Sequence, residues 1–201
     1  IRDRTLHHLS HRDSGFGADP AGSHPDALIN QPRDALIAEL NGLIQQLHPD
    51  VVLTHDETGG YGHRDHIRCH EVTVAAFHAA EPWKPQRLYV EVTSDRWMRV
   101  AAKTMRLLRK DPTRVGANKD IDLTKVGVPS SAITTRVDIR SSWPAKKAAA
   151  SHHKSQGGGP PHTRHLPAAL LKLLFPKETF MRIEPAPQPG LSEASLFEGL
   201  A

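Results

Sequence analysis

A short apolar run followed by glycines and histidines occupies residues 51–70, which read VVLTHDETGGYGHRDHIRCH. Its first part, Val51–Thr54, has the composition of a short strand that is buried on both faces. The glycines that follow loosen the backbone at the carboxyl end of this strand, and His63, Asp65 and His66 come directly after them. Open α/β sheets place their chemistry at this edge. The stretch therefore predicts an α/β fold together with a candidate active site.

Helical and strand-like patterns alternate on both sides of this stretch. Apolar residues at helical spacing predict a helix over Arg33–Leu47, and a second helix is expected from about Asp65 to Ala80. The remaining elements that we expect are strands at 87–92, 133–139 and 179–184 and helices at 95–109, 143–153 and 167–175. This alternation indicates an α/β fold with a Rossmann-like, mostly parallel sheet flanked by helices.

The expected elements form one domain over residues 1–184, followed by a loose tail over 185–201. A chain of 201 residues is long enough for one domain with its own core. Within the domain, the polar stretch Lys110–Ser131 predicts a loop or flap. The opening residues, IRDRTLHHLS, read as the middle of a domain, so we expect the first βα unit of the fold to be missing from these residues.

Charge and composition argue against several classes of protein. The chain has 26 Lys and Arg residues against 22 Asp and Glu residues, and the basic residues are scattered except at Arg99–Lys110. This pattern favours a solvated basic helix face over a nucleic-acid partner. No stretch approaches the roughly 18 apolar residues of a membrane span. A single cysteine, Cys69, excludes an internal disulfide framework and suits a cytoplasmic protein. The sequence is compatible with a homo-oligomer and leaves the oligomeric state open.

The histidines after the glycines have the spacing of a metal or proton-transfer site. His63 and His66 are three residues apart, so at the start of a helix they share a face. A neutral imidazole is a common zinc ligand, and a second imidazole beside the metal can stabilise an oxyanion or move a proton. Asp65 is placed to hold an imidazole in one tautomer. Most of the 14 histidines in the chain are better explained as surface residues, whereas this cluster also has the glycines and the preceding strand.

A different metal site could be formed by His66 and His70, which are four residues apart with Cys69 beside them. The helical zinc-protease motif requires a Glu directly after its first His as the general base. That position is Ile67 in this chain, so the protease reading fails. Cys69 and His70 are therefore expected to be packing or surface residues.

Three segments in a fixed order carry a family resemblance. They are HRDSG at 11–15, PDVVLTHDETGGYGHRDHIRCHEVTVAAF at 49–77, and a late helix with Lys147, His153 and Gln156. Together they resemble the LmbE/PIG-L family, the zinc-dependent N-deacetylases of N-acetylglucosamine conjugates, which include deacetylases of the mycothiol and bacillithiol pathways.

The resemblance implies a Zn²⁺ cofactor and a role for each residue of the cluster. His66 corresponds to a zinc ligand, His63 to the electrophilic or acid imidazole, and Asp65 to the carboxylate that orients it. Tyr61 corresponds to a residue that helps to hold the oxyanion or the sugar.

The same resemblance implies a substrate-binding set elsewhere in the chain. Asp13 would contact sugar hydroxyls, and Arg12 is a weaker candidate for the same task. His153 would support the pocket, or it is a buried structural histidine of its helix.

The chain departs from the family pattern at two places. Family members begin with a strand that ends in alanine-histidine-proline-aspartate-aspartate-glutamate, which supplies a His ligand, an Asp ligand and the Asp base. Here His-Pro-Asp occurs at 24–26 and at 48–50, and both segments are better explained as turns because neither has the required order or flanking residues. The usual proline of the second motif is Arg64 in this chain.

These observations support one main hypothesis and two alternatives. The main hypothesis is a metal-dependent hydrolase that removes the N-acetyl group from an N-acetylglucosamine-containing small molecule, that is, an amino-sugar conjugate. The first alternative is a catalytically incompetent remnant or sugar-binding module of the same fold, since only one of the three expected zinc ligands is visible. The second, a nucleotide-binding domain, is disfavoured because Gly59–Gly62 lacks the glycine fingerprint.

Overall fold

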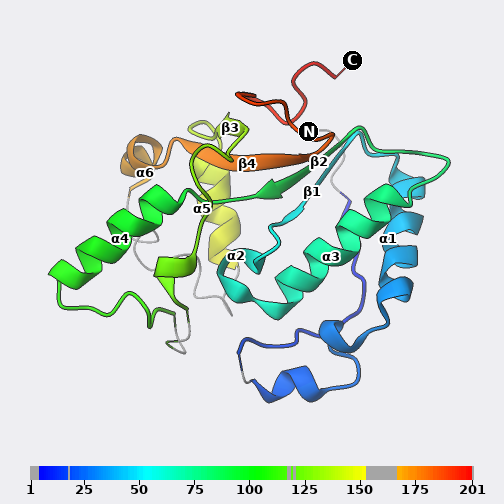
Figure 1. The fold of residues 1–201 in the computed structure, drawn as a ribbon, viewed down its shortest axis with the longest axis horizontal. Helices are drawn as coiled ribbons and strands as arrows, with labels where there is room; N and C mark the ends of the chain where they lie inside the picture. The colour runs from blue at the N-terminus through cyan, green and yellow to red at the C-terminus, as the bar shows by residue number, and fades with distance from the viewer. Residues whose placement is uncertain (1–4, 18, 117–118, 120, 153–166, 201) are drawn as a thin grey trace.

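A computed structural model describes residues 5–17, 19–116, 119, 121–152 and 167–200 (Figure 1). The strands are β1 (Val51–His55), β2 (Arg87–Glu91), β3 (Thr135–Asp138) and β4 (Lys177–Glu184). The α-helices are α1 (Arg33–Leu47), α2 (Gly59–Gly62), α3 (Arg64–His78), α4 (Asp95–Leu107), α5 (Trp143–His152) and α6 (Ala168–Leu174). Three short 3₁₀ helices span Pro20–Ser23, Leu28–Asn30 and Leu123–Lys125.

The four strands form one sheet in the order β1-β2-β4-β3, which confirms the predicted α/β class. β1 and β2 are parallel, with Val51 opposite Arg87 and His55 opposite Glu91. β4 runs antiparallel to both of its neighbours, so β1, β2 and β3 point the same way. Because β4 lies between β2 and β3, only the β1–β2 pair is parallel and the described sheet is mixed.

Helix α1 has the bounds that its apolar stripe predicts, and it packs on α3. Both helices bury small and branched side chains in a shared core, which consists of Ile44, Ala76 and Ala80 with Ile37, Leu40 and Trp83 at its edge. The helix ends at His48, whose φ of 47° is left-handed and whose N–H donates to the Ile44 carbonyl. The His-Pro-Asp segments at 24–26 and 48–50 are thus a turn and a helix end, as predicted.

Strand β1 is less buried than its composition suggests. We expected burial on both faces, yet the strand is half-buried and Leu53 is 48% exposed. The reason is its position, since among the described strands β1 pairs with β2 alone, and α3 packs against it. Among the described strands, a run of apolar residues therefore marks an edge strand and not a central one.

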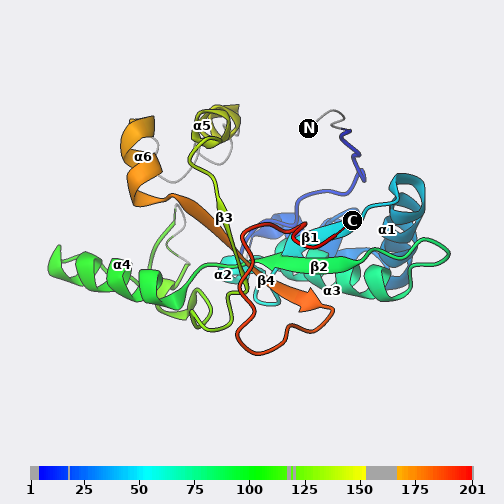
Figure 2. The ribbon, with the colours of Figure 1, turned by 90° about the horizontal axis from the view of Figure 1, so that it is seen from above.

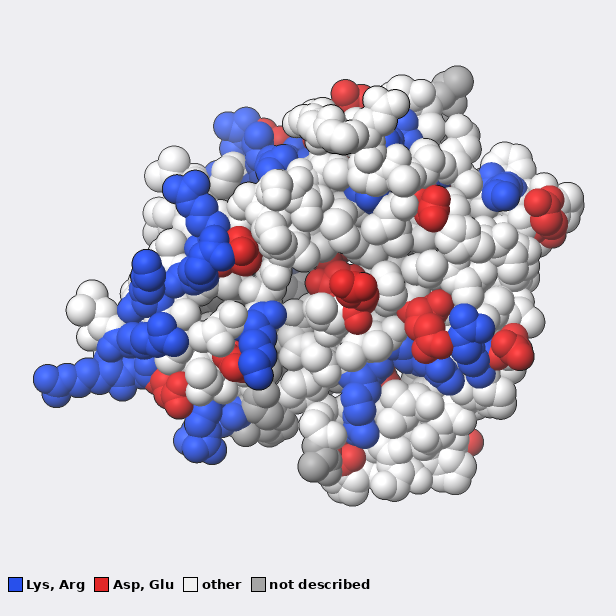
Figure 3. Space-filling model, in the orientation of Figure 1, with Lys and Arg blue, Asp and Glu red and all other residues white. Residues whose placement is uncertain are grey.

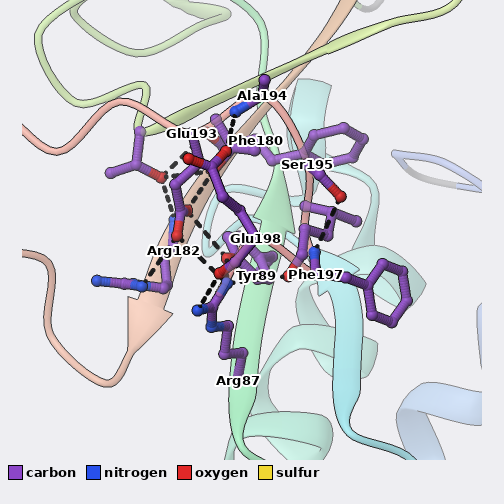
Figure 4. A network of polar contacts seen from close by, with 12 residues as sticks. Arg87, Tyr89, Phe180, Arg182, Glu193, Ala194, Ser195, Phe197 and Glu198 are labelled. Atoms are coloured by element: carbon purple, nitrogen blue, oxygen red, sulfur yellow. Dashed lines mark hydrogen bonds and ion pairs between the residues drawn. The ribbon is translucent and has the colours of Figure 1, made fainter. Parts of the chain in front are cut away.

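The segment after β4 is attached to the sheet, in contrast to the loose tail that we expected. Glu193 is buried and accepts hydrogen bonds from Tyr89 on β2 and Thr135 on β3, at 2.9 and 2.8 Å (Figure 4). Its other carboxylate oxygen forms ion pairs with Arg87 and Arg182, at 3.3 and 3.0 Å. We call these five residues the Glu193 network. It ties residues 193–198 to three of the four strands.

Helix α4 extends away from the sheet (Figure 1). Helices α5 and α6 lie together on the side of the sheet away from α4 (Figure 2). Arg96, Arg99, Lys103 and Arg106 on α4 are exposed, and basic side chains cover this part of the molecule in Figure 3. A solvated basic helix face was predicted here. Between α4 and β3, the described residues form turns, isolated bridges and one 3₁₀ helix, in agreement with the predicted loop. Among the described helices, none has the length and apolar character needed to cross a membrane.

Candidate active site

A tight loop after β1 brings the histidine cluster to the carboxyl end of the sheet. The buried Asp56 accepts three hydrogen bonds with one oxygen, from the Thr58 N–H, the Thr58 hydroxyl and the Gly60 N–H, at 3.0, 2.8 and 2.8 Å. Gly59 has a left-handed φ of 66°, and a Cβ on it would lie 2.9 Å from the Ile67 side chain. Only glycine fits this turn, because both the backbone conformation and the close approach of α3 exclude a side chain. The loop thus fixes where α3 begins.

His66 is held in one orientation on the first turns of α3. Its Nδ1 lies 3.2 Å from the Gly59 carbonyl oxygen, so the ring donates Nδ1–H and keeps a lone pair on Nε2. His55, the last residue of β1, stacks flat on this ring with centroids 3.9 Å apart and an angle of 2°. Burial is the main cause that lowers the pKa of both imidazoles. The neighbouring His66 lowers the pKa of His55 further, and His63 does the same for His66. Both rings are therefore kept neutral, which is the state that binds a metal.

His63 caps the helix and joins the stack. Its Nδ1 accepts a hydrogen bond from the Asp65 N–H at 3.2 Å, so the neutral ring carries its proton on Nε2. The ring stacks on His66 with centroids 4.6 Å apart. Phe16 also stacks on His63, with ring centroids 5.6 Å apart. Tyr61 lies edge-on to His63 and His66, with centroids 6.0 and 5.6 Å away. The result is an aromatic cluster around two imidazoles.

Two contacts attach the N-terminal segment to the start of α3. The Ser14 N–H donates to Asp65 Oδ2 at 2.9 Å, and Arg64 Nη2 donates to the Ser14 carbonyl at 2.7 Å. Asp65 is 8% exposed, and its second oxygen, Oδ1, is buried without a hydrogen-bond partner among the described residues. Arg64, which replaces the usual proline, thus has a structural task in this chain. The Arg64 guanidinium also packs closely on Gly22, because a Cβ added to Gly22 would lie only 2.5 Å from Arg64 Nη2.

The same contacts bring Asp13 to the cluster. Asp13, His63 and Asp65 each offer one potential ligand atom, and these atoms lie within 4.8 Å of one another. Asp13 is exposed, and its Oδ1 accepts a hydrogen bond from the Gly15 N–H at 2.6 Å. We call these three side chains the Asp13 group.

His66, the predicted zinc ligand, is suitably oriented to bind a metal, but it would be a single ligand. His66 has the arrangement usual for a ligating imidazole, with one ring nitrogen bound to a carbonyl and the other free. The Asp13 group, however, does not include His66, and within the described residues no other group of three potential ligands lies so close together. The donors around His66 are therefore fewer than the three protein ligands of a catalytic zinc site.

Most of the predicted site residues lie together in the structure. His63, Asp65, His66, Tyr61 and Asp13 gather at the start of α3, as the contacts above show. Arg12 does not join them. Its backbone pairs with Ala27, and its exposed side chain makes no hydrogen bond or ion pair within the described part of the chain. His153 lies outside the described residues.

His70 and Cys69 have the packing positions that were expected for them. His70 Nδ1 bonds to the His55 carbonyl oxygen at 2.8 Å and so helps to fix the end of β1. Cys69 is partly buried, and burial raises the pKa of its thiol, which disfavours a reactive thiolate.

Four residues of the site were missed from the sequence: His55, Asp56, Ser14 and Phe16. His55 carries the best local signal, because it directly follows the predicted strand Val51–Thr54 and so belongs to the same sheet edge. Asp56 has the residue type of a turn former two residues before Thr58. The contacts of Ser14 and Phe16 join segments about 50 residues apart, and no local pattern announces them.

Comparisons with known proteins agree on one family. The family model described as "PIG-L: GlcNAc-PI de-N-acetylase" matches residues 3–77. Three relatives are each named 1D-myo-inositol 2-acetamido-2-deoxy-alpha-D-glucopyranoside deacetylase. The protein of Thermobifida fusca is 32% identical over 153 residues, covering 73% of this chain and 52% of the relative. That of Rhodococcus jostii is 36% identical over 159 residues, covering 72% and 51%. That of Saccharomonospora viridis is 32% identical over 192 residues, covering 94% and 68%. The chain thus spans about half the length of the first two relatives.

Proposed function

The chain belongs to the PIG-L family, and from this membership we propose that it is a hydrolase that removes the N-acetyl group from a small molecule containing N-acetylglucosamine. The N-acetylglucosaminyl-inositol named for the relatives is the first substrate to test. The observation that carries the proposal is the cluster at the start of α3, where a neutral His66, a proton-bearing His63 and Asp65 meet Asp13. These groups match the needs of amide hydrolysis on a sugar.

Zinc is the metal that we propose for this reaction, with Nε2 of His66 as one ligand. Bound zinc supplies Lewis acidity toward the acetamide carbonyl and a water whose pKa is lowered to roughly 7. The family resemblance assigns the other ligands to a block that has no counterpart in these 201 residues. His55 and Gly59 would position His66 for the metal, through the ring stack and the bond to Nδ1.

His63 is proposed as the proton donor of the reaction. Its Nε2–H is free of the contact that Nδ1 makes with the Asp65 N–H. The carboxylate of Asp65 lies within 4.8 Å and stabilises the ring when it becomes positively charged. From this position His63 can donate to the carbonyl oxygen as negative charge develops, or protonate the leaving amine.

Asp13 and Tyr61 are proposed to contact the sugar. Asp13 Oδ1 is occupied by the Gly15 N–H, so Oδ2 remains for a sugar hydroxyl at the exposed side of the cluster. A carboxylate that accepts from a hydroxyl makes a charge-assisted hydrogen bond. Tyr61 lies edge-on against both imidazoles, where its ring borders the space in front of His63 and His66.

The test is amine release from N-acetylglucosaminyl-inositol by the purified protein, combined with elemental analysis for zinc. His66→Ala should remove most of the zinc and the activity, whereas His78→Ala, at the far end of the same helix, should change neither. Full zinc occupancy in the His66→Ala protein would remove His66 from the metal site. Sugar binding without amine release or zinc would support the alternative, a sugar-binding module, which the small number of donors around His66 also favours.

A further inference from the structure

We propose that Asp13, His63 and Asp65 form a divalent-cation site of their own, distinct from the position at His66, and that a cation there excludes the sugar. The site itself stands on the geometry of the three side chains. The second part, competition with the sugar, rests on the proposed function, which uses the same residues.

The spacing of the Asp13 group suits an ion between its members. The three potential ligand atoms lie within 4.8 Å of one another, yet among the described residues no side-chain hydrogen bond or ion pair joins any two of these side chains. Metal bonds to carboxylate oxygen or imidazole nitrogen are about 2.0–2.2 Å long, so two ligands of one ion lie up to about 4.4 Å apart. The three groups therefore make no direct bond, and shifts of a few tenths of an ångström would bring them to the spacing of ligands that share a cation.

Backbone contacts leave each carboxylate with one oxygen to offer. The Ser14 N–H binds Asp65 Oδ2 and the Gly15 N–H binds Asp13 Oδ1, which fixes the orientation of both side chains. Asp65 Oδ1 is buried and has no partner among the described residues, although the side chain of Asp65 is 8% exposed in all. A buried carboxylate oxygen without a partner is costly, so this atom calls for a positive or donating ligand at the group.

The donor chemistry selects the class of cation. Two carboxylates and one imidazole form a set that suits Zn²⁺, Mn²⁺ and Co²⁺. His63 contributes an imidazole whose Nδ1 accepts the Asp65 N–H at 3.2 Å, and a bound ion would replace this hydrogen bond or the proton on Nε2. His66 is not among the three close ligands, so it does not complete this set.

Competition with substrate follows from the shared residues. A cation held by Asp13 and His63 occupies the oxygen proposed for the sugar hydroxyl and the ring proposed as proton donor. Excess metal should therefore inhibit amine release, and a higher substrate concentration should relieve the inhibition.

The test is a titration of the metal-free protein with Co²⁺, followed by calorimetry and by the visible absorption of the bound ion. We expect His66→Ala, which lacks the tightly bound zinc, still to take up one added Co²⁺ ion with the affinity of the weaker site in the unmodified protein, while Asp13→Asn and His63→Gln each weaken that site at least about tenfold. Asp19→Asn is the matched control, because Asp19 also accepts a backbone N–H two residues ahead in the same exposed segment. Far-ultraviolet circular dichroism checks that each variant is folded.

Two outcomes would overturn the site. One is a protein whose Co²⁺ binding is lost in His66→Ala and kept in Asp13→Asn, because the ion would then bind at His66. The other is absence of Co²⁺ binding in a folded, metal-free protein, which would assign the space to water or to a sugar hydroxyl. Neither outcome depends on amine release, so failure of the cation site and failure of the proposed hydrolysis are distinguishable.

Discussion

Glu193 and Asp65 are both buried carboxylates, with 6% and 8% of their surface exposed, and their oxygens are used in different ways. Glu193 has both oxygens occupied, one by Arg87 and Arg182 and the other by Tyr89 and Thr135 (Figure 4). Asp65 has Oδ2 on the Ser14 N–H and Oδ1 without a partner among the described residues.

The difference separates a structural carboxylate from one that is available for chemistry. A charge surrounded by two guanidinium groups and two hydroxyls is stabilised in one state, and it leaves no atom for a ligand. The pKa of Tyr89 is raised, first by burial and then by its bond to Glu193, so this tyrosine remains a donor. Asp65 instead keeps one oxygen without a partner among the described residues, and its carboxylate lies close to His63 and Asp13.

The largest expected effect comes from removing the carboxylate of Glu193, which tests whether this carboxylate has a structural role. Glu193→Ala should lower the free energy of unfolding by about 3–5 kcal/mol, because two largely buried arginine side chains, 11% and 12% exposed, lose the buried carboxylate that pairs with them. Urea unfolding measures this loss, and Glu81→Ala, at an exposed position, serves as the control. A loss below about 1 kcal/mol, the typical value of an exposed ion pair, would show that the Glu193 network does not hold the tail.

Substitutions in the other region should change the rate far more than the stability. His63→Ala should lower amine release by roughly 100- to 1000-fold, the effect of losing one proton-transfer or oxyanion partner. Asp65→Asn should cost roughly 10- to 100-fold, because it removes the negative charge that stabilises the positively charged His63 ring within 4.8 Å. In both variants the tightly bound zinc should stay near that of the unmodified protein. The urea midpoint should stay near it in Asp65→Asn, while His63→Ala should lose about 1 kcal/mol with the cap of α3. A large drop in the midpoint without a change in rate would make Asp65 a structural residue like Glu193.

Arg64 tests whether the N-terminal segment depends on α3 for its position. Arg64→Ala removes the hydrogen bond to the Ser14 carbonyl, and the half-buried position predicts a loss of about 1 kcal/mol. Arg64→Lys should retain part of this bond. Hydrogen exchange of the Ser14 and Gly15 amides should become faster in the alanine variant. Unchanged exchange would mean that Asp65 alone holds the segment.

The smallest effect concerns pH. Burial lowers the pKa of His55 and His66 below their ordinary value of 6.5, so the folded protein keeps these rings neutral while the unfolded chain takes up protons. Since the unfolded state binds more protons, the free energy of unfolding should decrease as pH falls below about 6.5. His55→Phe keeps a ring on His66 and removes one of the two groups, so its unfolding free energy should depend less steeply on pH. An equal slope in both proteins would contradict this cause.

The parts of the fold that sequence predicts are those with a local pattern. Helix α1 was predicted with its observed bounds because its apolar residues repeat at helical spacing. His63, Asp65 and His66 were recognised because glycines and a strand precede them within a few residues. His55 was overlooked because one histidine among 14 has no distinguishing neighbour pattern, although it directly follows the predicted strand Val51–Thr54.

The parts that could not be predicted depend on contacts between distant segments. Ser14 binds Asp65 across 51 residues, and Tyr89 binds Glu193 across 104. These bonds decide that the tail is attached and that Asp13 reaches the cluster, yet neither changes composition or periodicity nearby. The edge position of β1 is of the same kind, because its missing second neighbour is a property of the sheet and not of Val51–Thr54.

The place of β4 also has a consequence for how the protein is synthesised. β4 is the last of the described strands in sequence order, but it lies between β2 and β3 in the sheet. While the ribosome is still producing residues before Lys177, β2 can pair with β1 alone and β3 has no neighbour in the described sheet. Nascent chains of this length therefore present an unpaired strand edge, which other chains can bind and which favours aggregation. When β4 is produced, it pairs with β2 and β3 and removes that edge. Glu193, which follows β4 in the chain, then accepts a hydrogen bond from Thr135 on β3.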